Sequence, residues 1–170
     1  MRRFFFALLA PLAACASAEK ETHDDYLLNA LPGAEGFEPF VRFGRGPLEI
    51  RAEAWLESGI PVFDLQLYNR SSARITITTA GIRMLSEGRI GQDSVHLLDE
   101  NEERMMQVIL LGYERRKTKV RPASSDLWPP GPVILEVRGI RDDRGEGGLD
   151  FDLRAVPKEK SEPEIKTVEK

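Results

Sequence analysis

Few side chains in this sequence have the type and spacing that catalysis requires. The chain has two histidines, His23 and His96. His96 lies between Val95 and Leu97, and no Gly-x-Ser-x-Gly motif accompanies it, so a Ser-His-Asp site would need distant partners. We therefore expect His96 to make an ordinary hydrogen bond in a strand or loop.

Asp150 and Asp152 form the second candidate site. Alternate residues of a strand share one face about 6 to 7 Å apart, a separation that could suit glycoside hydrolysis. Arg138 and Arg154 lie nearby in the expected hairpin and would keep both carboxylates ionised, whereas a general acid must hold a proton. We therefore predict a structural role for this pair.

Metal and cofactor chemistry has little support in the composition. Zinc and copper sites usually need several His or Cys ligands, and the chain has two histidines and one cysteine. Residues 142–148 lack the alternating ligands and terminal Glu of an EF-hand loop, and Arg144 adds a positive charge. We expect no metal, no cofactor and no catalytic residue, and a hairpin tip at 142–148.

The N-terminus has the architecture of a secretory signal peptide. Arg2 and Arg3 precede an apolar run at residues 4–10, which is too short for a membrane-spanning helix of about 20 residues. Small residues then lead into Leu12-Ala13-Ala14-Cys15. We predict that residues 1–14 are a signal peptide.

The Leu12-Ala13-Ala14-Cys15 sequence resembles the lipobox of bacterial lipoproteins. The resemblance implies cleavage before Cys15 and acylation of its sulfur, and two or more acyl chains anchor a protein stably on a membrane. Ala16 stands where many lipoproteins of the inner membrane have Asp, so the resemblance favours the periplasmic face of the outer membrane. Cys15 is the only cysteine, so no intramolecular disulfide can form.

The net charge argues against nucleic acid as a partner. It is −4 for the whole chain, and cleavage of the leader would make it −6 by removing Arg2 and Arg3. One basic cluster stands out, at residues 115–119. We interpret it as a solvated strand end rather than a site for nucleic acid or lipid headgroups.

The chain divides into four parts. After the signal peptide we expect a lipidated N-terminus and flexible tether at 15–38, and one β-sandwich domain at 39–156. Residues 157–170 are nearly all charged or polar, and so few apolar residues cannot offset the entropy of ordering. We predict that this tail is disordered.

Alternation of apolar and polar residues predicts a first hairpin over residues 48–68. A two-residue loop would place Glu53 opposite Asp64, which is a repulsive pair. We favour a four-residue loop that places Glu53 opposite Gln66 and Arg51 opposite Tyr68.

A second hairpin is predicted near the C-terminus, where strands on either side of the loop at 142–148 alternate in the same way. We expect Arg138 opposite Asp152 and Val137 opposite Leu153. This register pairs opposite charges on the outer face and apolar residues on the inner face.

Residues 94–120 allow two interpretations. Asp99 followed by Glu102 resembles a capping box, and Gly112 could end a helix, which favours a short helix at 100–111. The apolar run at 108–111 could equally be a buried strand. The pattern as a whole predicts a mainly β protein, a β-sandwich of immunoglobulin-like architecture.

The loop at 126–132 presents an aromatic side chain next to three prolines. Pro129 and Pro130 restrict the chain to extended conformations, so Trp128 would lose little entropy on docking to a partner. We take Trp128, Pro129 and Pro130 as candidate partner contacts. The alternative is that Trp128 closes one end of the sandwich.

These observations favour a non-catalytic, membrane-anchored lipoprotein that acts as a protein-interaction or envelope-assembly module in the bacterial periplasm. Its expected partners are the membrane, through Cys15, and another envelope protein. The alternative is a periplasmic small-ligand carrier or hydrolase that uses His96 or the face of Asp150 and Asp152. A pocket around those side chains would favour the alternative.

Overall fold

The computed structural model describes residues 25–31, 36–86, 94–124, 128–129, 131–145 and 148–158. The predicted signal peptide, Cys15 and nearly all of the predicted disordered tail lie outside the described residues. The described chain is mainly β, as the alternation predicts, with one 3₁₀ turn, η1, at Thr79–Gly81. None of the described residues forms a helix that is long and apolar enough to cross a membrane.

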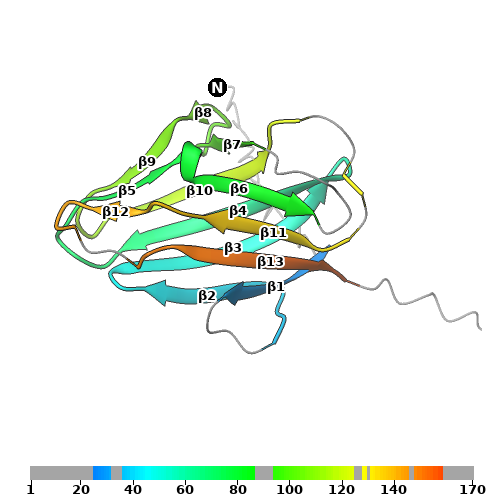
Figure 1. Ribbon diagram of the computed structural model, residues 1–170, viewed down its shortest axis with the longest axis horizontal. Helices are drawn as coiled ribbons and strands as arrows, with labels where there is room; N and C mark the ends of the chain where they lie inside the picture. The colour runs from blue at the N-terminus through cyan, green and yellow to red at the C-terminus, as the bar shows by residue number, and fades with distance from the viewer. Residues whose placement is uncertain are drawn as a thin grey trace, which may run out of the picture.

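The strands form three antiparallel sheets (Figure 1). Their orders are β1-β13-β11-β6, β2-β3-β4-β10-β7-β8 and β12-β5-β9. The strand bounds are β1 Tyr26–Leu31, β2 Phe40–Arg45, β3 Leu48–Glu57, β4 Ile60–Asn69, β5 Ile75–Thr78, β6 Ile82–Ser86, β7 Val95–Leu98, β8 Arg104–Met105, β9 Gln107–Leu110, β10 Arg115–Pro122, β11 Val133–Val137, β12 Arg141–Asp142 and β13 Phe151–Pro157.

The four-stranded and six-stranded sheets pack together as a β-sandwich. Their facing side chains form one hydrophobic core, in which Phe43 of β2 meets Phe151 of β13 edge to face, with ring centroids 5.3 Å apart. Strands β5 and β12 adjoin β6 and β11 along the chain, so the three-stranded sheet continues one edge of the sandwich. The immunoglobulin-like order of strands stays a prediction.

The predicted tether is wrong for residues 26–31, which form β1. Tyr26, Leu28 and Ala30 are buried, and β1 pairs with β13 along its whole length. The alternation in β1 was not recognised in the sequence because the strand is short and a turn-prone sequence follows it. As a result, Tyr26 lies opposite Pro157, and the described chain begins and ends at the same end of the domain.

The first hairpin closes through a two-residue turn, so the predicted four-residue loop is wrong. Glu57 pairs with Ile60, and both turn residues have positive φ, 52° at Ser58 and 82° at Gly59. Such a turn matches the right-handed twist of the two strands. The register that it sets places Glu53 opposite Asp64.

Neighbouring cations remove the repulsion in that pair. The Glu53 carboxylate accepts a hydrogen bond from Arg51 at 2.9 Å, and Lys117 of β10 forms an ion pair with Asp64 at 3.0 Å. The sequence argument counted only the two opposing carboxylates, whereas each of them has a cationic partner of its own.

The second hairpin forms as an antiparallel pair, but its register differs from the prediction by two residues. Val137 lies opposite Phe151, and Glu136 lies opposite Asp152. Arg138 still forms an ion pair with Asp152, diagonally, and its other terminal nitrogen is 3.8 Å from Glu136. One arginine thus neutralises both carboxylates.

The structure has no helix at 100–111; β8 and β9 occupy half of this segment, so the strand alternative is correct. Asp99 Oδ1 accepts hydrogen bonds from the backbone N–H groups of Asn101 at 2.8 Å and Glu103 at 2.9 Å. Glu102 has a φ of 63°, which is not helical. The capping signal therefore belongs to a tight turn that leads into β8.

Asn69 joins the loops at the end of the domain opposite to Asp25 and Lys158, the first and last described residues. Its side chain is fully buried, and Nδ2 donates to the carbonyl oxygens of Ala73 at 2.5 Å and Leu111 at 3.0 Å. Oδ1 accepts hydrogen bonds from the backbone N–H and the hydroxyl of Ser71, at 3.0 and 2.9 Å. One amide therefore links the loop after β4 to the loop after β9.

Asn69→Ala should destabilise the protein by about 2 kcal/mol, because carbonyl groups that are shielded from water would lose their donor. Urea unfolding measures this loss. Gln66→Ala, on the exposed side of the same strand, is the matched control and should stay within about 0.5 kcal/mol of wild type. Equal stability of the two variants would contradict the linking role of Asn69.

Candidate functional site

Trp128 does not project from the surface. Its side chain is 7% exposed and belongs to the hydrophobic core. Pro129 is half-buried, and Pro130 lies outside the described residues. The burial of Trp128 favours the alternative in which the indole packs inside the sandwich, because a buried ring cannot serve as a partner's first contact.

His96 lies on β7 opposite Arg121 of β10. It lines a hollow of about 230 Å³ together with Arg104, Arg121 and Glu57. Burial lowers the pKa of His96 below its ordinary 6.5, and the positive charges of Arg104 and Arg121 lower it further. The hollow favours the small-ligand alternative, but it is smaller than the common range of about 300 to 1,000 Å³ for such sites.

Asp150 and Asp152 each serve the fold. Asp150 Oδ1 accepts a hydrogen bond from the backbone N–H of Ile140 at 3.1 Å, and Asp152 forms the ion pair with Arg138. The hydrogen bond that Arg138 donates to Asp152 raises the pKa of Arg138. Both carboxylates are therefore engaged in contacts within the domain.

Metal binding has no candidate among the described residues, in which no group of three or more His, Cys, Asp or Glu side chains could hold an ion.

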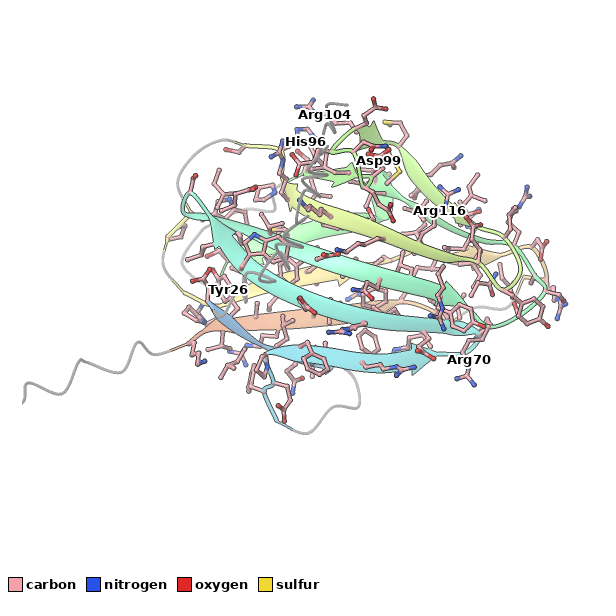
Figure 2. The ribbon with its side chains drawn as sticks, turned by 180° about the vertical axis from the view of Figure 1, so that it is seen from behind. Tyr26, Arg70, His96, Asp99, Arg104 and Arg116 are labelled. Atoms are coloured by element: carbon pink, nitrogen blue, oxygen red, sulfur yellow. The ribbon has the colours of Figure 1, made fainter. Side chains whose placement is uncertain are left out.

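The sequence analysis missed a groove on the outer face of the six-stranded sheet, the face that Figure 2 turns toward the reader. Its volume is about 530 Å³, and β2, β3, β4 and β10 form its floor. Alternate residues of these strands supply most of its lining, which consists of Phe40, Arg42, Glu49, Arg51, Gln66, Leu67, Tyr68, Glu100, Arg115, Arg116 and Lys117.

Arginines lie over aromatic rings in this groove. The Arg51 guanidinium is 4.7 Å from the centre of the Phe40 ring, and Arg115 is 4.7 Å from that of Tyr68. Such cation–π contacts hold the planar guanidinium groups, which are hydrogen-bond donors, in fixed orientations. A third arginine of the groove, Arg42, forms an ion pair with Glu49 at 2.5 Å.

The groove is suited to binding a polar ligand. Among its charged side chains, Glu49 is already paired with Arg42, and Lys117 with Asp64. The groove offers guanidinium donors, carboxylate acceptors and aromatic rings side by side. Such a surface can recognise a polar segment of a partner.

The correct register of the first hairpin would have indicated this groove from the sequence. The two-residue turn places Tyr68 beside Glu49, and the pairing of β4 with β10 places Arg115 on its other side. The predicted four-residue loop would have moved Tyr68 opposite Arg51 and so disguised the arrangement.

No protein-family model matches this chain, and no curated protein matches it at a significant level.

The imidazole of His96 should titrate below pH 6.5, and its proton NMR signal measures this pKa directly. Arg104→Gln should raise the pKa by removing a nearby cation, whereas Arg42→Gln, in the distant groove, should not change it. Because the folded pKa lies below the unfolded one, stability should fall as the pH drops below about 6.5. His96→Gln should remove that loss, and a measured pKa at or above 6.5 would contradict the account.

Proposed function

We propose that this protein is a lipid-anchored, non-catalytic binding module of the bacterial cell envelope. Acylated Cys15 holds it on the periplasmic face of the outer membrane, where it contacts another envelope protein. The lipobox sequence Leu12-Ala13-Ala14-Cys15 supports the anchor. The groove on the outer sheet face, whose lining combines guanidinium donors, carboxylate acceptors and aromatic rings, supports the binding role.

The single observation that carries the proposal is that the first and last described residues lie at the same end of the domain. Asp25 and Lys158 meet at one end of the domain, where the Lys158 N–H donates to the Asp25 carbonyl at 2.9 Å. A tether from Cys15 would therefore enter the domain at this end. The opposite end, with the loops after β4 and β9, stays free to meet a partner (Figure 1).

The alternative function, a carrier or hydrolase, has one supporting observation, the hollow beside His96. Two arginines border that hollow, so a ligand there would be a small anion. The face of Asp150 and Asp152 adds no support, because its carboxylates are bound to Ile140 and Arg138.

Cys15→Ser should leave the domain folded but move it from the membrane fraction to the soluble fraction, because it removes the sulfur that the lipid modifies. Carbonate-washed membranes and incorporation of labelled palmitate measure the change. Ser17→Ala, which leaves the lipobox intact, is the matched control and should stay on the membrane. Equal retention of the Cys15→Ser variant and wild type would refute the anchor.

His96→Ala should leave the cellular phenotype of the gene unchanged when abundance and melting temperature match wild type, because a binding module has no need of an imidazole base. A phenotype scored beside immunoblots and thermal melts checks this. Complete loss of function at wild-type abundance and melting temperature would replace the binding module with the carrier or hydrolase.

A further inference from the structure

We infer that the turn Leu111-Gly112-Tyr113-Glu114 is the anchor by which this module binds a folded protein whose surface has an apolar pocket edged by carboxylates. The inference rests on the proposed function as a binding module and adds the contact surface and the partner's chemistry. We call this turn, with the loop at 69–74 and the loop at 141–145, the distal tip.

The distal tip exposes two large apolar side chains next to each other. Leu111 is 59% exposed and Tyr113 is 65% exposed. Tyrosine and arginine are enriched among the few residues that dominate binding energy in protein interfaces. The tip therefore has an anchor of the type that Trp128, in the core, cannot provide.

The turn that presents these side chains is locked in place. Leu111 N–H donates to Glu114 Oε2 at 2.7 Å, and Glu114 N–H donates back to the Leu111 carbonyl at 3.1 Å. Tyr113 N–H donates to the Ser71 carbonyl at 3.0 Å, which fastens the turn to the neighbouring loop. An anchor that is already ordered loses less entropy on binding.

Tyr113 holds a backbone conformation that glycine would adopt more easily. Its φ is 62°, in the left-handed region, which is unfavourable for a residue with a Cβ. The neighbouring Gly112 is required for a different reason, because a Cβ there would lie 2.8 Å from Ser72 Cα. The chain thus keeps an aromatic side chain at a position where it strains the backbone, and such strain is common at functional sites.

Exposed positive charge surrounds the anchor. Figure 2 shows Arg70 and Arg116 at the same end of the domain, opposite Tyr26. The Arg74 carbonyl accepts from Asp143 N–H at 3.0 Å, and the Arg144 side chain donates to Ser72 Oγ at 2.6 Å, so these loops are in contact. The exposed arginines of the distal tip and its flanking strand ends are Arg70, Arg74, Arg115, Arg116, Arg141 and Arg144.

The carboxylates of the distal tip do not balance this charge at the surface. Asp142 is buried, and Glu114 is half-buried and bonded to Leu111 N–H and Arg116. Within the described part of the tip, Asp143 is the one exposed carboxylate. An acidic chain therefore presents a basic rim around an apolar anchor, which is complementary to a pocket edged by carboxylates.

The rigidity of the turn favours a protein over a membrane as the partner. A fluid bilayer accepts apolar side chains in many orientations, and its affinity follows the apolar area inserted and the charge of its lipids. A strained, locked turn adds nothing to such binding. It does improve binding to a pocket of fixed shape.

Photocrosslinking in the host cell tests the contact. Full-length acylated protein carries p-benzoylphenylalanine in place of Tyr113, and the matched control carries it in place of Met106, which is 82% exposed and lies at the other end of β9. We expect an adduct with one defined envelope protein from position 113 and none from position 106. Mass spectrometry of the adduct identifies that protein for purification.

Affinity measurements with the purified partner test the chemistry. In the Cys15→Ser background, Tyr113→Asn should weaken binding about thirtyfold or more without lowering the melting temperature, since Asn tolerates a left-handed φ. Met106→Asn should bind like wild type. Arg70→Glu combined with Arg74→Glu should weaken binding about tenfold or more and reduce its dependence on salt.

Each of three results would overturn the inference. The first is the absence of an adduct above the control at position 113, and the second is an affinity that Tyr113→Asn leaves unchanged. The third is binding to phosphatidylglycerol vesicles that Tyr113→Asn abolishes, which would assign the tip to a membrane. Binding through the distal tip does not require acylation. The soluble Cys15→Ser background therefore separates a failure of this inference from a failure of the proposed lipid attachment at Cys15.

Discussion

The two-residue turn at Ser58 and Gly59 sets the register on which the rest of the six-stranded sheet depends. Strand β4 pairs with β3 on one side and β10 on the other, and the turn fixes which residues of β3 and β4 lie opposite each other. It places Tyr68 opposite Glu49 and Glu53 opposite Asp64, and the pairing of β4 with β10 adds Arg115 on the other side of Tyr68. The groove follows from these two registers together, and the turn geometry is compatible with the like charges of Glu53 and Asp64 because Arg51 and Lys117 neutralise them.

Both hairpins were predictable as strands but not in register, for one physical reason. Side chains alternate with a period of two, so a shift by two residues leaves every side chain on its own face, and burial cannot distinguish the two registers. The predicted registers were therefore chosen from the charges of the residues that would lie directly opposite each other. In the structure, however, Lys117 neutralises Asp64, and Arg138 serves both Glu136 and Asp152. Cations outside the opposing pair cannot be counted until the neighbouring strand or the diagonal contact is known.

The distal tip was less predictable than the fold because its residues come from loops that are distant in the sequence. The basic cluster at 115–119 was interpreted as a solvated strand end, which holds for the cluster alone. The structure brings Arg115 and Arg116 beside the loop at 69–74 and behind the exposed Tyr113. Conversely, Trp128 stood out in the sequence and is in the core. The expected structural roles of Asp150 and Asp152 follow from short-range pairing, and the structure contains such pairings.

The central claim is that this domain binds through the end opposite to its anchor, and hydrogen–deuterium exchange tests it most directly. The acylated protein in native outer-membrane vesicles is compared with the purified Cys15→Ser protein. The account predicts slower exchange in the vesicles at 69–74 and 110–116. It predicts unchanged exchange at the turn of Ser58 and Gly59, at the end of the domain where the described chain begins and ends. Protection confined to His96 and residues 121–124, or unchanged exchange across the described domain, would contradict it.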